Sequence, residues 1–364
     1  MRNEDFFGLY KRSDGIWYYY VYRWGKKVRR STGERRKCDA LRIVMARRDR
    51  GDLLNEQAHT VWTTFREFAS PFWIWETCPV IRDKIERGGH FSRLLARTNR
   101  QNTDKYLVPA FGSKVLPEIT PAMIKVWLRG VPGKYGVTPQ TANKQLTMLR
   151  QILDVAVEEN IIRTNPARSV KPLIPKESER GCFTLQQVQA LFSEHWPNRY
   201  IEAMCRLAAL TGMRLGEVQG LCFDQIRNDT IDLDRSWAKM EGLKTPKSGK
   251  SRYIPIPSDL TVELRSFLHQ GDLIFTLNGE RPIDATSVRY ALRKRMDECG
   301  IDWQAEKLSF HSFRHFANSH LLDAGLQGES VRAIIGHASA RMTQRYNHLQ
   351  PETCDRIRII QEAI

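Results

Sequence analysis

The run LSFHSFRHFANSHLLDAGLQGESVRAIIGHASARMTQRYNHL, residues 308–349, decides the fold. It holds His311 and Arg314 three residues apart, then His337, then Tyr346 nine residues later. Residues three apart on a helix share one face, so His311 and Arg314 can address one small target. Arg offers a planar fork of donors that suits a phosphate, and His can move protons near neutral pH. Tyr346 lies in a run that we interpret as helical, and its hydroxyl is a candidate nucleophile.

A plainer interpretation of the same run is an amphipathic helix whose His and Arg are ordinary exposed side chains. Apolar residues do recur at helical spacing, at Phe313, Phe316, Ala317 and Leu321. His311 and His315 are four apart, a spacing that suits a metal ion, but no HExxH motif or third ligand accompanies them. We therefore expect no metal site.

Two upstream stretches change the balance between these interpretations. In AALTGMRLGEVQGL, residues 208–221, a helix is predicted to stop at Gly212 and a new one to start near Arg214, with Glu217 one turn later. In LKTPKSGKSRYIPIP, Lys247 falls in a Ser-Gly turn between two strand-like runs. Cationic side chains thus recur in a fixed order ahead of the tyrosine.

This ordered set resembles the tyrosine recombinases, the phage integrase family, over roughly residues 183–349. TGMRLGE matches the family's first-arginine motif, the turn lysine and the HxxR box follow, and the LGH box appears as IGH, which keeps the histidine. Any one motif is weak, but six ordered positions with the right spacing are specific. The matching positions are Arg214, Lys247, His311, Arg314, His337 and Tyr346.

The resemblance implies attack by the tyrosine on a DNA phosphodiester, giving a 3′-phosphotyrosine and a free 5′-hydroxyl. The two arginines would stabilise charge on the non-bridging oxygens, and Lys247 would protonate the leaving 5′ oxygen. The two histidines would bond the phosphate or assist proton movement, and Glu217 would orient the cationic groups. The bond energy is conserved, and no Walker motif is present, so we expect neither ATP nor any other cofactor.

Composition and charge agree with a nucleic-acid partner. A length of 364 residues suggests two or three domains, and a net charge of +16 with a pI near 9.7 favours a polyanionic partner over a merely solvated basic surface. There is no secretory signal and no apolar run long enough for a membrane span, so we expect a cytoplasmic, nucleoid-associated protein. Seven scattered cysteines without a CxxC motif predict free thiols.

Residues 1–60 are predicted to form an N-terminal arm-type DNA-binding domain of three strands and a helix. Asp14-Gly15 is a hairpin signal, and a helix is expected in CDALRIVMARRDR. The region has 15 Lys and Arg against 8 Asp and Glu, and aromatic residues lie between the charges. Its candidate DNA contacts are Arg23, Lys26, Lys27, Arg29 and Arg30; the alternative is a small packed sheet whose charges only solubilise it.

Residues 61–175 are predicted to form a helical core-binding domain of the SAM-like type. The resemblance implies that this domain clamps the duplex, with Asn143, Lys144 and Arg150 as candidate contacts; the alternative is that these three residues only form the solvated face of a long helix. Residues 176–364 are expected to form a mixed, mostly helical catalytic domain, with TIDLDRSW and SRYIPIP paired as the hairpin that carries Lys247. The fold class is thus mainly α with small β-sheets. Family tails such as PETCDRIRIIQEAI pack onto a neighbouring protomer, which the resemblance implies here too.

The leading hypothesis is a site-specific recombinase that integrates or excises a phage or mobile element. Its partners would be double-stranded DNA, other copies of the chain in a tetramer on DNA, and an accessory DNA-bending or directionality protein. Two alternatives stay open: a DNA-binding regulator on the same scaffold without strand exchange, and a type IB topoisomerase-like enzyme.

Overall fold

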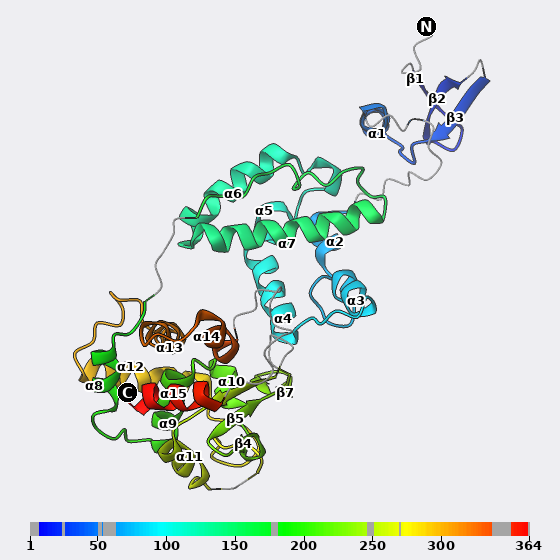
Figure 1. Ribbon diagram of the computed structural model, residues 1–364. Coiled ribbons are helices and arrows are strands. Elements are labelled where there is room, and N and C mark those ends of the chain that lie inside the picture. The colour runs from blue at the N-terminus through cyan, green and yellow to red at the C-terminus, as the bar shows by residue number, and fades with distance from the viewer. Residues whose placement is uncertain are drawn as a thin grey trace. The chain divides into compact units, whose positions relative to one another are not determined.

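The computed structural model describes residues 7–23, 26–49, 53, 63–175, 181–245, 251–268, 271–336 and 351–362 (Figure 1). The chain divides into two units close to residue 176, with a short stretch, residues 92–94, grouped with the second unit. The structure is mostly helical with small antiparallel sheets, as predicted.

The N-terminal part is a three-stranded antiparallel sheet followed by one helix, which confirms its predicted architecture. β1 (Phe7–Lys11), β2 (Trp17–Arg23) and β3 (Lys26–Ser31) are paired in chain order, and α1 (Lys37–Asp49) follows. The turn between β1 and β2 is closed by the Asp14 carboxylate, which accepts a hydrogen bond from the Ile16 amide at 2.9 Å. Alternation along β2 places Tyr19 and Val21 in a small core with Val44 of α1.

The helical part of the first unit is built around one long helix. That helix, α7 (Pro139–Glu158), buries one face, and its N-cap Thr138 side chain accepts a hydrogen bond from the Thr141 amide. The Pro that follows Thr138 suits the first helical turn, where no amide donor is needed. The other elements are α2 (Phe65–Ala69), α3 (Pro79–Glu86), α4 (Arg93–Asn102), a π-helical turn (Thr103–Leu107), α5 (Val108–Phe111), a 3₁₀ turn (Leu116–Glu118) and α6 (Pro121–Tyr135).

The second unit combines helices with two small sheets. The sheets are β4 (Ile226–Arg227), β5 (Thr230–Leu233) and β8 (Arg252–Pro255) in one, and β6 (Ser236–Ala238) with β7 (Gly242–Lys244) in the other. The helices are α8 (Leu185–Phe192), α9 (Arg199–Thr211), α10 (Leu215–Gln219), a 3₁₀ turn (Phe223–Gln225), α11 (Ser258–Arg265), α12 (Ala285–Glu298), α13 (Ser312–Asp323), α14 (Gly328–Ile335) and α15 (Pro351–Glu362).

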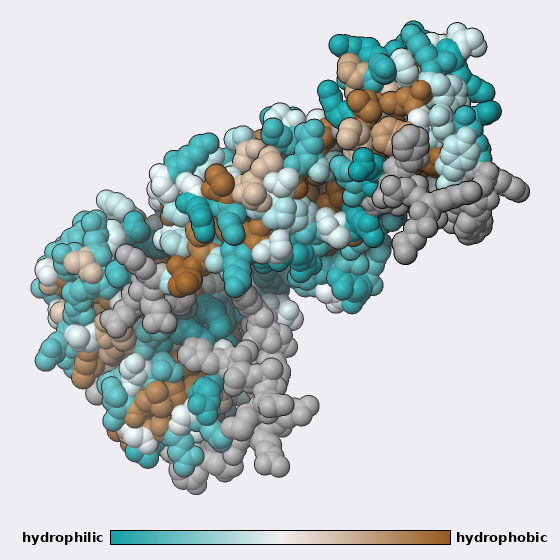
Figure 2. Space-filling model, turned by 90° about the horizontal axis from the view of Figure 1, so that it is seen from above, coloured by the Kyte–Doolittle hydropathy of each residue, from teal (hydrophilic) through white to brown (hydrophobic). Residues whose placement is uncertain are grey.

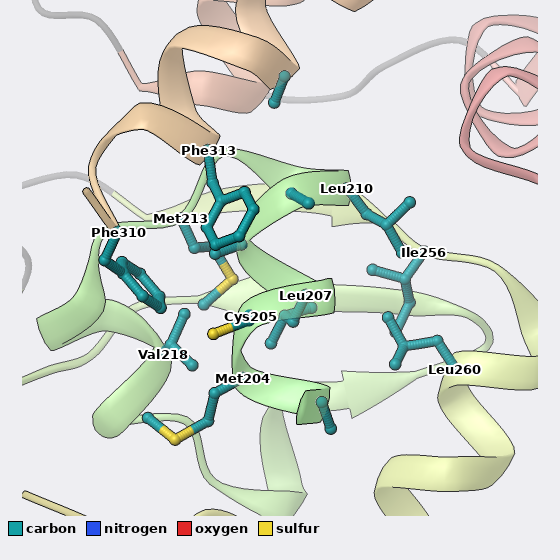
Figure 3. Close-up of a cluster of buried hydrophobic side chains, with 14 of the residues drawn as sticks. Met204, Cys205, Leu207, Leu210, Met213, Val218, Ile256, Leu260, Phe310 and Phe313 are labelled. Atoms are coloured by element: carbon teal, nitrogen blue, oxygen red, sulfur yellow. The ribbon is translucent and has the colours of Figure 1, made fainter. Parts of the chain in front are cut away.

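Helix α9 is the centre of the second unit's core. Its residues from Ala203 to Thr211 are buried apart from Arg206, and Figure 3 shows side chains of neighbouring elements gathered around it. Phe313 of α13 points toward Met213, next to the end of α9 (Figure 3). The amphipathic pattern of the HxxR run is therefore a core-packing pattern as well, because Phe313, Phe316 and Leu321 are all buried.

Two expectations for the second unit need correction. The pairing of β5 with β8 is as predicted, but it is not a simple hairpin, because the β6–β7 pair is inserted between the two strands. The C-terminal tail forms the expected helix, α15, but packs on its own chain. Ile357 is fully buried, and the Gln361 amide donates to the Leu210 and Pro255 carbonyls at 3.0 and 3.1 Å.

The visible surface is mainly hydrophilic, with separate apolar patches (Figure 2). Within the described residues, no helix combines the length and apolar character that crossing a bilayer requires. All seven cysteines are free thiols, as predicted from their scattered positions.

Candidate active site

The first element of the site is the sharp junction between α9 and α10. Gly212 ends α9 in the left-handed conformation, with φ of 65°, as the sequence predicts. A Cβ on Gly212 would lie 2.4 Å from the Ile335 Cδ1 of α14, so glycine is needed for the approach of the two helices as well as for the turn. The chain then places Arg214 at the N-cap of α10.

Glu217 is the buried carboxylate that holds Arg214. Its side chain is 2% exposed, and its Oε1 accepts from the Arg214 Nη1 at 2.8 Å. Its Oε2 accepts from the Arg214 backbone amide at 2.9 Å. The glutamate thus binds both the backbone and the guanidinium of Arg214, as expected for a carboxylate that orients a cationic group.

A third charged residue, Arg252 at the start of β8, completes this ion pair. Its side chain is 8% exposed, and its Nη2 lies 2.7 Å from the Glu217 Oε2. Sequence reasoning missed Arg252, yet a signal was present: it shares the inward phase of its strand with Ile254, where an apolar residue is the rule. A charge at an apolar position of a strand indicates a buried partner.

Arg314 enters the site from the first turn of α13. Its Nη1 donates to the Gly212 carbonyl at 2.8 Å and its Nη2 to the Gly336 carbonyl at 3.2 Å. These carbonyls lie at the C-terminal ends of α9 and α14, where helix dipoles favour a cation. Burial, helped by the nearby charge of Arg214, lowers the pKa of Arg314 to about 10.

All three arginines donate hydrogen bonds to backbone carbonyls at the end of α14 and in the turn that follows it. Gly336 has φ of 74° and ends α14 in the left-handed conformation. Its carbonyl accepts from Arg314 and, at 3.4 Å, from the Arg214 Nη2. The Arg252 Nε donates to the Ile334 carbonyl at 2.7 Å. Three guanidinium groups therefore bind backbone carbonyls within the three residues before the IGH histidine.

The cluster carries excess positive charge. Among the described residues, Arg214 and Arg252 form ion pairs with the Glu217 carboxylate, whereas Arg314 donates to backbone carbonyls. Three guanidinium groups and one carboxylate leave two positive charges in excess. Burial raises the pKa of Glu217, but bonds and charges from Arg252 and then Arg214 outweigh it and leave that pKa below its usual value. The carboxylate is therefore ionised, and the site as a whole favours an anion.

The structure brings some predicted site residues together and leaves others untested. Arg214, Glu217 and Arg314 form the cluster, and His311 is an exposed residue directly before α13, with its ring 5.1 Å from that of His315. Lys247, His337 and Tyr346 lie outside the described residues. No metal-binding group of His, Cys, Asp or Glu occurs within the described part of the chain.

The candidate DNA contacts of the N-terminal sheet separate into two faces. The strand register sets Lys27 and Arg29 opposite Tyr22 and Tyr20, on the face that α1 does not cover, and both basic side chains are exposed. The Lys27 ammonium lies 3.7 Å from the centre of the Tyr20 ring. Arg30 pairs with the buried Tyr19 and belongs to the other face, while the side chains of Arg23 and Lys26 lie outside the described set.

The three candidate contacts on α7 differ from one another. The Asn143 amide both donates to and accepts from the backbone of Leu173, each at 2.8 Å. Arg150 donates to the carbonyls of Ala167 and Val170 at 3.0 and 2.6 Å. These two residues hold the following segment against the helix, whereas Lys144 is exposed and stays a candidate for DNA contact.

Comparisons with known proteins show which family the chain resembles. Residues 183–353 match the model of the phage integrase family. Tyrosine recombinase XerC of Corynebacterium glutamicum is 29% identical over 244 residues, which cover 57% of this chain and 75% of that protein. Tyrosine recombinase XerD of the same organism is 25% identical over 292 residues, covering 74% and 91%.

Solved structures share the fold. A lambda integrase tetramer bound to a Holliday junction has a TM-score of 0.59 at 16% identity, covering 94% of this chain and 98% of that one. An integrase of the transposon Tn1549, in complex with transposon right end DNA, has a TM-score of 0.60 at 17% identity, with coverages of 75% and 95%.

Proposed function

Since this chain belongs to the tyrosine recombinase family and is a tyrosine-type site-specific recombinase, we propose that it integrates or excises a phage or another mobile element. It cleaves and rejoins DNA through a 3′-phosphotyrosine intermediate. The observation that carries the proposal is the buried arginine cluster with two positive charges in excess. The structural likeness to lambda integrase and to the Tn1549 transposon integrase supports the mobile-element role.

The three arginines differ in how far they are exposed, and this decides which of them a phosphate can reach. Arg314 is 3% exposed and Arg252 is 8% exposed, whereas the Arg214 side chain is 32% exposed. Arg214 is thus the group that an incoming phosphate meets first, and Arg314 adds its charge from behind. Preorganised cations of this kind stabilise charge that grows on non-bridging oxygens without reorganising during the reaction.

The proposed reaction has two chemical parts, nucleophilic attack and departure of the 5′ oxygen. The Tyr346 hydroxyl attacks phosphorus, the bond from phosphorus to the 5′ oxygen breaks, and Lys247 gives that oxygen its proton. The tyrosine loses its proton on attack, and the imidazole of His311 or His337 accepts it. Rejoining is the reverse: a 5′-hydroxyl attacks the phosphotyrosine and frees the enzyme.

The substrate is double-stranded DNA, held by a tetramer of this chain. The lambda integrase tetramer on a Holliday junction supports that assembly, because strand exchange needs two duplexes and one protomer for each cleaved strand. Lys27, Arg29 and Lys144 are the remaining candidates for DNA contacts among the described side chains. An accessory DNA-bending or directionality protein, and action at the nucleoid in a bacterial cytoplasm, belong to the same proposal.

Covalent capture tests the proposal against a DNA-binding regulator. Wild-type protein and Tyr346→Phe are incubated with a labelled duplex that carries a nick near the cleavage position, and the mixture is run on a denaturing gel. We expect a shifted protein–DNA band for the wild type and none for the phenylalanine variant, although both bind the duplex. A detergent-stable adduct with the variant would remove Tyr346 from the nucleophile role.

Recombination between two cloned sites separates an integrase from a type IB topoisomerase-like enzyme. Both classes form the same covalent bond, so cleavage alone does not distinguish them. An integrase yields recombinant product from two sites, whereas a topoisomerase relaxes supercoils on any plasmid and yields no recombinant. Relaxation without recombinants would overturn the integrase role.

A further inference from the structure

Arg252 binds two parts of the arginine cluster that come from distant positions in the chain. It begins β8, it is paired through the strand register with Leu233 of β5, and its side chain reaches Glu217 of α10 and Ile334 of α14. We propose that Arg252 is a positioning residue of the cleavage reaction, fixing Arg214 through Glu217 and the turn before His337 through Ile334. This inference rests on the proposed function.

The link to Arg214 is a shared carboxylate. Arg252 uses both terminal nitrogens on Glu217, at 2.7 Å to Oε2 and 3.3 Å to Oε1. Arg214 binds the same two oxygens, through its side chain at Oε1 and its backbone amide at Oε2. The planar fork of Arg252 therefore sets the plane of the carboxylate, and the carboxylate sets the direction of Arg214. A lysine carries the same charge at this place but cannot set that plane.

The link to the IGH turn is a hydrogen bond and a close approach. The Arg252 Nε donates to the Ile334 carbonyl, one of the last carbonyls of α14 that the helix itself leaves free. A Cβ on Gly336 would lie 3.1 Å from the Arg252 guanidinium, so the turn rests directly on this group. Arg252 therefore supports the last residues of α14 and Gly336, directly before His337 in the sequence.

Arg295 is a matched control from the same unit. It is as buried as Arg252, 8% exposed, and it too donates to a backbone carbonyl, that of Leu191 at 3.0 Å. It also donates to the Glu194 carboxylate at 3.4 Å and forms an ion pair with Glu298 at 3.5 Å. It lies on α12, and these partners are outside the arginine cluster. Arg295→Lys therefore reports the cost of losing a buried guanidinium without disturbing the site.

The test compares Arg252→Lys with Arg295→Lys in the full chain. Single-turnover cleavage of the nicked duplex is measured at saturating protein, together with DNA affinity and thermal unfolding. We expect Arg252→Lys to slow cleavage by about ten- to a hundredfold with DNA affinity within about twofold, as for other residues that orient a functional group. Arg295→Lys should lose a similar amount of stability and keep its cleavage rate. Equal cleavage rates for the two variants would overturn the proposal.

A double substitution tests whether Arg252 acts through Arg214. If it does, adding Arg252→Lys to Arg214→Lys slows cleavage little further, because the group being positioned is already altered. Independent effects that multiply would overturn the link. A substrate with a 5′-bridging sulfur, which leaves without a proton, should not restore the Arg252→Lys rate, because the defect is at the arginines and not at the general acid.

A readout without substrate keeps this inference separate from the proposed function. Hydrogen exchange of the amides of residues 334–336 should be faster in Arg252→Lys than in Arg295→Lys, since the turn loses its support. Exchange at equal rates in the two variants would overturn the positioning role. Absence of cleavage by the wild type would instead overturn the proposed function, and the exchange result would still stand.

Discussion

Glu217 is the residue on which the charge balance of the site depends. Among the described residues it is the carboxylate that pairs with both Arg214 and Arg252, and Arg252 is nearly as buried as Glu217 itself. Replacing it with glutamine leaves a buried cation without a counter-charge. We expect Glu217→Gln to lower the free energy of unfolding at pH 7 by roughly 3–5 kcal/mol, the usual cost of breaking a buried pair from one side.

The stability that Glu217→Gln loses should depend on pH, in a direction that follows from the pKa of Glu217. The pKa of Glu217 is lower in the folded chain than in the unfolded chain, so its contribution is complete above the unfolded pKa and is lost as pH falls through the folded one. The stability gap between the wild type and Glu217→Gln should therefore begin to narrow as pH falls below about 4, near the usual glutamate pKa, and close below the folded pKa. Urea unfolding across pH measures this difference in stability.

A control variant removes an exposed carboxylate instead. Asp355→Asn, which removes an exposed partner of Arg358, should change stability by about 0.5 kcal/mol or less. A constant gap between wild type and Glu217→Gln at all pH values would contradict the argument.

Changing the leaving group of the DNA should distinguish the proposed general acid, Lys247, from the two arginines that bind the phosphate. Lys247→Ala should slow cleavage of normal DNA by about 10²–10⁴-fold, the usual worth of a general acid, and should recover on a substrate with a 5′-bridging sulfur. Arg214→Ala and Arg314→Ala should each slow cleavage by about 10²–10³-fold and recover little on that substrate, because in the proposed mechanism their charge acts on the non-bridging oxygens. Single-turnover rates on the two substrates decide this. Lack of recovery by Lys247→Ala would assign the proton to another group.

At the scale of elements, α15 is bound to its own chain by the buried side chain of Ile357 and by polar contacts that include those of Gln361. Ile357 is fully buried, whereas Ile359, two residues later, is 67% exposed. We expect Ile357→Ala to lower the free energy of unfolding by about 2–4 kcal/mol, because it leaves a cavity under the helix, and Ile359→Ala to change it by about 0.5 kcal/mol or less. Denaturant unfolding of dilute, monomeric protein makes the comparison. Equal small effects would mean that the helix is not docked on its own core in solution.

At the scale of the whole molecule, the proposed function assigns arm-site DNA binding and cleavage to different parts of the chain. Removing residues 1–60 removes 15 Lys and Arg against 8 Asp and Glu. The slope of log affinity against log salt should flatten by roughly 0.9 for every DNA phosphate that these residues neutralise in the intact protein. Cleavage at a single core site should survive, because the arginine cluster is untouched, whereas recombination between two distant sites should fail.

A milder variant checks that the flatter salt dependence comes from losing the basic residues of the sheet and not from truncating the chain. Lys27→Ala with Arg29→Ala removes two exposed cations from the open face of the sheet, and Arg42→Ala removes one from α1, where its side chain is 69% exposed. We expect the first pair to reproduce part of the flattened salt slope and the control to leave it unchanged. Unchanged slope and recombination in the truncated protein would reject arm-site binding by residues 1–60.

The sequence by itself determined those features that depend on neighbouring residues. Gly212 predicted the end of α9, the next helix followed at Arg214, and Asp14-Gly15 predicted the first hairpin. Turns, caps and helix periodicity arise from interactions within a few residues, so a single sequence contains them. The order of cationic motifs ahead of a tyrosine also identified the family, because those motifs are short and keep their spacing.

Only the tertiary structure decided which distant side chains meet. Arg252 lies 35 residues from Glu217 and 82 from Ile334 along the chain, and no local pattern encodes such pairings. The same reason explains Asn143 and Arg150, whose helical positions favoured DNA contacts but whose polar groups bind the backbone of residues 167–173. A buried polar group must find a partner, and the sequence shows that need without showing the partner; the packing of α10, α14 and β8 supplies it.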